Sequence, residues 1–303
     1  MRSIFLGSLS AVALLSLSAC GNPAEEPAEE GVTETAAPAE TEAPEPVVDY
    51  SDLNTVLAGD WRGEAAERDA WRHPAETLEF FGVDPSSTIV EIWPGGGWYA
   101  DVLAPWIAAN DGTYVAAHFP ADSSSDYRRR SRANFEARVS DVPAYGEPEI
   151  VDFNSEVGLV VEAGSVDAVL TFRNIHNWMA GGVAEPAFAE FYTALRPGGI
   201  LGVVEHRMPS TRQQDPMARS GYVQQDYVIA MAEEAGFEFV EASEVNANPA
   251  DTADHPYGVW TLPPTRRSPA EDEEGFEDFD RAQYDAIGES DRMTLLFRKP
   301  DAE

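Results

Sequence analysis

The chain has 303 residues, a length that suits one or two domains with a sizeable core. Its 54 acidic residues against 20 basic ones give a net charge of −34. This balance argues against nucleic acid and anionic lipid as partners, because both need basic surfaces.

The first 20 residues have the pattern of a targeting segment. Arg2 supplies a positive start, and residues 4–17 are an apolar run too short to span a bilayer. The run ends in LSAC (17–20), which resembles a bacterial lipoprotein signal box, and Cys20 is the only cysteine. We expect cleavage before Cys20 and lipidation of that residue. Because Gly21 follows, the resemblance implies an exported lipoprotein in the periplasm, on the inner face of the outer membrane, bound to the membrane only through its lipid.

Residues 21–48 consist mainly of Ala, Pro, Glu and Thr, and such a segment buries too little apolar surface to fold. We interpret it as a disordered acidic tether, followed by a folded domain over residues 49–303. The start of that domain, residues 49–87, is amphipathic and predicted to be helical, with Pro74 in the first turn of one helix. Two interpretations of His73 and Arg72 are open. Either one of them contacts a ligand, or both only pack against the domain or face solvent.

The other elements are organised around residues 88–99 (TIVEIWPGGGWY). Residues 89–92 are a β-branched run typical of a buried strand, and Pro94 ends it. Three glycines at 95–97 allow a sharp turn and a close backbone approach to a ligand, and a helix is predicted after them. This order builds a ligand crevice at the carboxyl end of a strand. No Gly-Lys-Ser/Thr follows, so a phosphate-binding P-loop is excluded.

The rest of the chain alternates between predicted strands and helices, which indicates an α/β fold. The polar segment RNIHNW (173–178) leaves one of the strands, and the sequence RPGG (196–199) makes a turn before the next. A long insertion at 246–285, with His255, Tyr257 and Trp260, is expected to pack partly over the crevice. Six more runs are predicted as strands: 112–119, 149–153, 166–172, 200–205, 237–242 and 293–298. Helices are predicted over 185–195 and 225–235.

An acidic residue late in the first strand, Glu91, followed by a glycine turn resembles the first motif of the class I S-adenosylmethionine-dependent methyltransferases. The segment at 195–199, between a helix and a strand, is characteristic of the same family. From about residue 60 to 300 the chain resembles a bacterial group of predicted methyltransferases. The resemblance implies a Rossmann-like, mostly parallel sheet of seven strands in the order 3-2-1-4-5-7-6, with the last strand antiparallel and helices on both faces.

The resemblance also implies S-adenosylmethionine as cofactor and methyl transfer to a small-molecule acceptor. In that family the acid and the glycine backbone face the methionyl part, which here selects Glu91, Gly95, Gly96 and Gly97. His118 stands where the ribose-binding acid is usual, Asp152 is the candidate for the adenine, and Arg173 completes the cofactor site. Over the methyl group lie the catalytic candidates Asn174, His176 and His206, the histidines as general bases.

Two alternative functions follow from departures from the family pattern and from the spacing of residues. Trp93 stands where the family usually has its first glycine, and its indole would either crowd the cofactor or stack on it. With His118 and the export signal, it motivates a scaffold or binding protein that kept the fold without the chemistry. A metal-dependent enzyme is the third hypothesis, because His176 and His206 end neighbouring strands and Glu205 could complete a zinc or iron(II) site.

Overall fold

The computed structural model describes residues 48–302. The targeting segment, Cys20 and all but the last residue of the expected tether lie outside the described residues. Within residues 48–302, no helix combines the length and the apolar composition that crossing a membrane requires.

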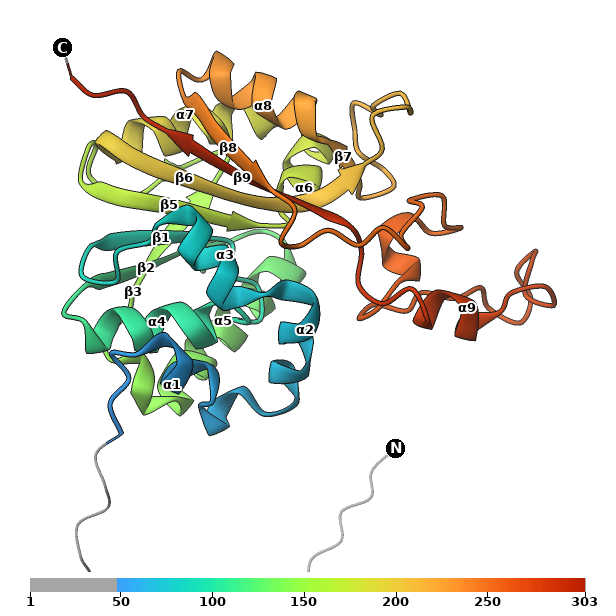
Figure 1. Cartoon of the computed structure of the whole chain (residues 1–303), viewed down its shortest axis with the longest axis horizontal. Coiled ribbons are helices and arrows are strands. Elements are labelled where there is room, and N and C mark those ends of the chain that lie inside the picture. Colours follow the sequence, from blue (N-terminus) through green and yellow to red (C-terminus); the bar gives the residue numbers. More distant parts are fainter. Residues whose placement is uncertain (1–47, 303) are drawn as a thin grey trace, which may run out of the picture. The chain divides into compact units, whose positions relative to one another are not determined.

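A twisted sheet forms the middle of the domain (Figure 1). Its order is β4-β3-β2-β1-β5-β6-β9-β8, and β7 pairs with the end of β6. Strands β3, β2, β1, β5 and β6 are parallel, whereas β9 runs antiparallel to both β6 and β8. The order of the seven predicted strands and the antiparallel last strand are therefore confirmed, but the sheet has nine strands instead of seven, because β4 and β7 add to it. The strands are β1 (Thr88–Ile92), β2 (Thr113–His118), β3 (Glu149–Asn154), β4 (Gly158–Leu159), β5 (Val166–Phe172), β6 (Leu195–Met208), β7 (Val223–Gln224), β8 (Glu238–Ser243) and β9 (Arg292–Arg298).

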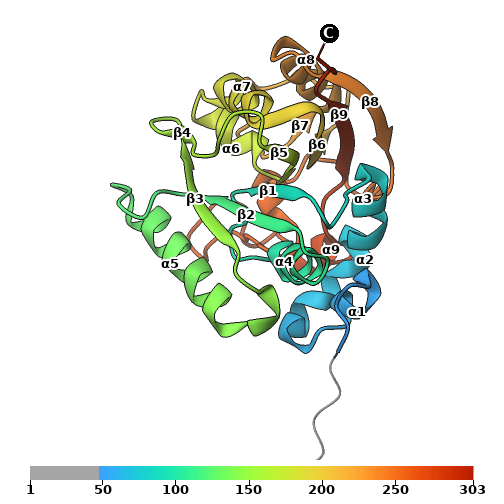
Figure 2. The ribbon, with the colours of Figure 1, turned by 90° about the vertical axis from the view of Figure 1, so that its left-hand side faces the viewer.

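Helices cover both faces of the sheet, with α4 and α5 on one side and α7 on the other (Figure 2). Alternation along β1 explains why both faces are apolar, because successive side chains point to opposite sides. Ile89 packs in the cluster beside α3 and α4, while Val90 and Ile92 pack in the cluster beside α6, α7 and α8. The α-helices are α1 (Leu53–Leu57), α2 (Asp69–Arg72), α3 (Pro74–Phe81), α4 (Ala100–Ala109), α5 (Asp126–Asp141), α6 (Ile175–Ala180), α7 (Ala184–Ala194), α8 (Gln225–Glu234) and α9 (Arg281–Asp285).

The start of β6 differs from the prediction. Residues 196–199 were expected to form a turn before a strand at 200–205, but β6 already begins at Leu195. Leu195 pairs with Val166 and Ile200 pairs with Ala168, so four residues of β6 bulge out opposite a single residue of β5. Gly198, at φ 74, makes this bulge possible.

The insertion between β8 and β9 lies beyond the carboxyl ends of the parallel strands (Figure 1). It contains a short 3-10 helix at Gly258–Thr261 and the helix α9. The segment before β1 also reaches this edge through a 3-10 segment at Asp60–Arg68 and through α2. The two segments thus bring side chains from far apart in the sequence to the edge where α/β sheets bind ligands.

Candidate functional site

A cavity of about 500 Å³ lies at the carboxyl ends of β1, β5 and β6. The chain after β1 forms one side of it, the N-terminal helical segments form another, and the 246–285 insertion closes it with Val259, Trp260 and Pro263. The predicted packing of this insertion over the crevice is confirmed. Seven predicted site residues line the cavity: Glu91, Gly95, Gly96, Arg173, Asn174, His176 and His206.

Glu91 presents a buried carboxyl group to the cavity. Its side chain is 2% exposed, and its Oε2 accepts a hydrogen bond of 2.6 Å from the Tyr114 hydroxyl. Burial raises the pKa of Glu91 to about 8, although the bond from Tyr114 acts in the opposite direction. Among the described residues it forms no salt bridge. Glu91 is therefore mainly protonated at neutral pH and is able to ionise when a cation binds beside it.

The glycine turn exposes backbone to the cavity at two of its three positions. A Cβ added to Gly95 or Gly96 would meet nothing within 4 Å, so both border open space. Gly95 also has φ 61, a conformation that favours glycine. Gly97 faces Phe135 and Tyr145 instead and does not line the cavity. The turn thus offers close backbone approach to the cavity through Gly95 and Gly96, whereas Gly97 is not among the residues that line it.

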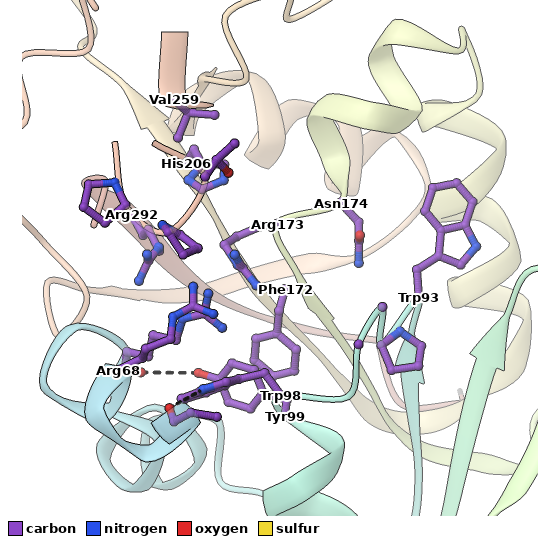
Figure 3. Close-up of a pocket in the computed structure, with 18 of the residues that line it drawn as sticks. Arg68, Trp93, Trp98, Tyr99, Phe172, Arg173, Asn174, His206, Val259 and Arg292 are labelled. Carbon is purple, nitrogen blue, oxygen red and sulfur yellow. Dashed lines mark hydrogen bonds between the residues drawn. The ribbon is translucent and has the colours of Figure 1, made fainter. Parts of the chain in front are cut away.

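Trp93 has φ 46, a strained value for a bulky residue, and its indole points away from the arginines of the cavity (Figure 3). The indole N–H donates to the Phe153 carbonyl at 3.1 Å, and the ring packs on Phe119, Phe153 and Trp178 with centroids 4.6 to 5.8 Å apart. A second cavity of about 260 Å³ lies against the same ring. Trp93 therefore leaves the space beside Gly96 open but fills the side toward β2 and β3.

Besides Gly97, two predicted cofactor residues do not line the main cavity. His118 is fully buried, its Nδ1 accepts from the Phe119 backbone N–H, and its ring packs on Phe135. Burial lowers the pKa of His118 to about 4, so it is neutral. Asp152 forms a salt bridge of 2.9 Å with Arg132. The expected ribose and adenine contacts are therefore not brought to the cavity, because one side chain is enclosed by the core and the other is already paired.

His176 is held in one orientation by Glu205. The Nδ1 of His176 lies 3.0 Å from Glu205 Oε1, and its backbone N–H donates to Glu205 Oε2. Since a carboxylate only accepts, Nδ1 carries the hydrogen, and in the neutral tautomer with that arrangement Nε2 has the lone pair. His206 lies beside it, with ring centroids 5.4 Å apart. Burial, with the nearby His176 and arginines, lowers the pKa of His206 well below its usual range, so His206 is neutral.

The side-chain amide of Asn174 forms a hydrogen bond that positions the backbone. Its Nδ2 donates to the carbonyl of Ile92 at 2.8 Å and thereby ties the end of β5 to the end of β1. This bond fixes the spacing of the two strand ends from which Glu91 and Arg173 project.

The three residues of the metal hypothesis lie close together. Ligand atoms of His176, Glu205 and His206 are within 4.8 Å of one another. The surroundings of these three residues are less suitable for a metal ion. Glu205 already accepts from the backbone N–H groups of His176 and His206 and from the His176 ring. A cation there would also face several buried arginines, and like charges repel strongly at low dielectric. We therefore do not assign a metal to these residues.

The most unusual part of the cavity is a group of four arginines that we call the arginine wall: Arg68, Arg72, Arg173 and Arg292. Only Arg173 among them is a predicted site residue, and the group as such has no signal in the sequence. Figure 3 shows the guanidinium groups of Arg68, Arg173 and Arg292 on one side of the cavity. Arg68, Arg72 and Arg292 share the Glu289 carboxylate. Arg72 also lies over the Trp98 ring, 4.5 Å from its centroid. Arg72 was considered as a ligand contact, but nothing in the spacing joined residues more than 200 positions apart.

Comparisons with known proteins support the fold. No family model matches the chain, and no curated protein matches it. Among solved structures, a protein of Galdieria sulphuraria described as a sarcosine dimethylglycine methyltransferase has a TM-score of 0.52 at 14% identity, covering 78% of this chain and 88% of its own. The [4+2]-cyclase SpnF has a TM-score of 0.51 at 17% identity, covering 84% and 94%. The chain therefore has the Rossmann-like fold found in methyltransferases, and the cyclase indicates that this fold does not by itself determine the reaction.

Proposed function

We propose that this protein is an S-adenosylmethionine-dependent methyltransferase that acts on a small molecule. One observation carries the proposal: the Glu91 carboxyl and the open backbone of Gly95 and Gly96 border the same cavity, at the carboxyl ends of β1 and β5. An ionisable acid that is free of arginine pairing suits a ligand with a cationic sulfur, and open backbone suits its close approach. The methyltransferase among the solved structures of this fold supports the same reading.

The residues fit the cofactor at its methionyl end. Glu91 and the backbone at Gly95 and Gly96 would hold that end, and the cofactor would supply an electrophilic methyl group. At the other end, Trp93 fills the space toward β3, so the adenosine would depend on contacts other than those expected from His118 and Asp152.

The protein's own contribution to catalysis would come from positioning and proton removal. Glu205 fixes the His176 ring and leaves Nε2 as the proton acceptor, so His176 would take the proton of a hydroxyl or amine acceptor. Asn174 holds β1 and β5 in register at the site, and positioning of this kind supplies much of the rate of an in-line transfer. Trp260, 6.1 Å from the His176 ring, closes the cavity on the solvent side and limits water.

Calorimetric titration of the full chain with S-adenosylmethionine tests the proposal. We expect saturable binding, and we expect Gly96→Val to weaken it at least tenfold, because the added side chain enters space that is open in the wild type. Ala121→Val, at an exposed position, is the matched control and should bind like the wild type.

A scaffold function is the second candidate, and the indole of Trp93 on the β3 side of the site favours it. It predicts that a folded protein binds no S-adenosylmethionine even at millimolar ligand. That result would overturn the methyltransferase proposal and leave the fold as the only inherited feature.

We propose further that the domain is exported and anchored through a lipid on Cys20, on the strength of the signal box in the sequence. Cys20→Ser should move the protein from the membrane fraction to the soluble fraction, because the anchor is the only membrane contact expected. Mass spectrometry of the N-terminal peptide provides the direct measurement. A protein that remains in the membrane fraction after this substitution would contradict the proposed anchor.

A further inference from the structure

The arginine wall concentrates positive charge in a chain that is strongly acidic overall. Its four guanidinium groups face two nearby carboxylates, Glu289 and Glu205, so two positive charges are left without a partner charge. The wall is assembled from three separate segments, before α3, after β5 and at the start of β9. With 54 acidic against 20 basic residues in the chain, such a concentration is not a consequence of composition.

The wall also contains hydrogen-bond donors that nothing accepts. Arg72 is 3% exposed, and its Nε donates to Glu289 at 3.0 Å, but its Nη1 and Nη2 have no partner among the described residues. The same is true of Arg68 Nη2 and Arg292 Nε. Buried charged donors left unpaired are costly, at about 1–3 kcal/mol each or more. A ligand with acceptor oxygens would remove that cost.

Arg173 is the member most available to a ligand. Within residues 48–302 its side chain forms neither a hydrogen bond nor a salt bridge. Burial and the charge of Arg292 lower its pKa to about 10, so it is still a cation at neutral pH. Its backbone has φ 63, which is uncommon for a residue with a side chain. A strained backbone that directs an unpaired cation into a cavity is a feature of binding sites.

We propose that the arginine wall is an oxyanion subsite, and that it holds the carboxylate or phosphate group of the methyl acceptor beside His176 and His206. The assignment to the acceptor rests on the proposed function. The cofactor itself carries one carboxylate and two cationic centres, so its net charge is unfavourable at this wall. An acceptor with a negative group complements the wall, and guanidinium groups bind carboxylate and phosphate through paired hydrogen bonds. The subsite would place the acceptor's reacting hydroxyl or amine near His176 Nε2.

Inorganic phosphate is the probe for the test, with the full chain and thermal unfolding as the readout. We expect phosphate to raise the melting temperature of the wild type more than sodium chloride of equal ionic strength does, because a ligand stabilises the state that binds it. Arg173→Gln should weaken phosphate binding at least about tenfold, since a charge-assisted hydrogen bond is lost. It should not lower the melting temperature without phosphate, because Arg173 has no structural partner in the described domain. Arg130→Gln, on the exposed face of α5, is the matched control and should respond to phosphate like the wild type.

The outcomes separate this inference from the proposed function. No shift beyond that of sodium chloride, or an equal response from Arg173→Gln, would overturn the subsite. Phosphate binding without S-adenosylmethionine binding would uphold the subsite and overturn both the methyltransferase and the acceptor assignment. If saturating S-adenosylhomocysteine excludes phosphate, the wall binds the cofactor's own carboxylate, and the acceptor assignment fails. Simultaneous binding of both ligands supports it.

Discussion

Replacing Glu289 by glutamine is expected to lower the free energy of unfolding by about 3–5 kcal/mol, the usual cost of breaking a buried ion pair from one side. Glu289 is 3% exposed, and its two oxygens are shared by Arg68, Arg72 and Arg292. Glutamine has nearly the same shape but no charge, so the three guanidinium groups would lie side by side without the carboxylate that they share. Urea unfolding of the wild type and the variant at neutral pH measures the difference.

Glu244→Gln provides the matched control. Glu244 also pairs with an arginine, Arg207, at 2.7 Å, but its side chain is 69% exposed. Exposed ion pairs contribute little, so this substitution should cost less than about 1 kcal/mol. Equal effects at the two positions would show that Glu289 does not stabilise the arginine wall.

The contribution of Glu289 to the free energy of unfolding changes with pH in a definite direction. Burial alone would raise the pKa of Glu289, but the charges of Arg292, Arg72 and Arg68 lower it from 4.5 to about 2. A carboxylate with a lowered pKa stabilises the folded state above its unfolded pKa, and that contribution is lost as the pH falls through the folded pKa. The stability difference between the wild type and Glu289→Gln should therefore shrink between about pH 4.5 and pH 2.

The sheet could be predicted because each buried strand has a local signal. Residues 89–92 and 166–172 are apolar runs between turn residues, and the parallel connections then restrict the order. The two-residue strands β4 and β7 have no such signal, since they exist only through pairing with β3 and β6. The bulge at the start of β6 was missed because its Pro and Gly residues favour a turn and the pairing of Leu195 overrides them.

Site residues could be predicted only where their position at the end of a strand determines where they lie. Glu91 and His176 were found because the carboxyl ends of adjacent parallel strands must meet at one edge. The direction of the Trp93 indole could not be found, because it depends on packing against Phe119 and Phe153. The grouping of the four arginines in the arginine wall could not be predicted for a third reason. Arg68 and Glu289 are 221 positions apart, and only the packed structure brings them together.

The second large expected effect is that of Glu91 on the pH dependence of the free energy of unfolding. Its sign is opposite to that of Glu289. Its pKa is raised from 4.5 to about 8, so the folded state keeps a proton that the unfolded chain has already lost. Stability therefore falls as the pH rises from about 4.5 to about 8, and levels off above that. Glu91→Gln removes this dependence while keeping an acceptor for the Tyr114 hydroxyl. At about 1.4 kcal/mol per pH unit, the variant should gain about 3–4 kcal/mol over the wild type between pH 5 and pH 8. Urea unfolding at several pH values measures this gain.

The control is Glu79→Gln on the exposed face of α3, which should change the free energy of unfolding by less than about 0.5 kcal/mol at each pH. A parallel pH profile for wild type and Glu91→Gln would mean that the carboxyl is not protonated in the folded state.

The protonation of Glu91 should also depend on ligand binding. A cationic sulfur bound beside Glu91 would favour its ionised form, so binding of S-adenosylmethionine at neutral pH should release a proton. Calorimetry in buffers with different ionisation enthalpies detects that release, and Glu91→Gln should abolish it. An anion bound at the arginine wall alone has no reason to ionise Glu91. Any proton that phosphate itself releases on binding there should therefore be the same in the wild type and in Glu91→Gln. If S-adenosylmethionine binds with the same proton release in the wild type and in Glu91→Gln, its positive charge lies elsewhere, and the role proposed for Glu91 is wrong.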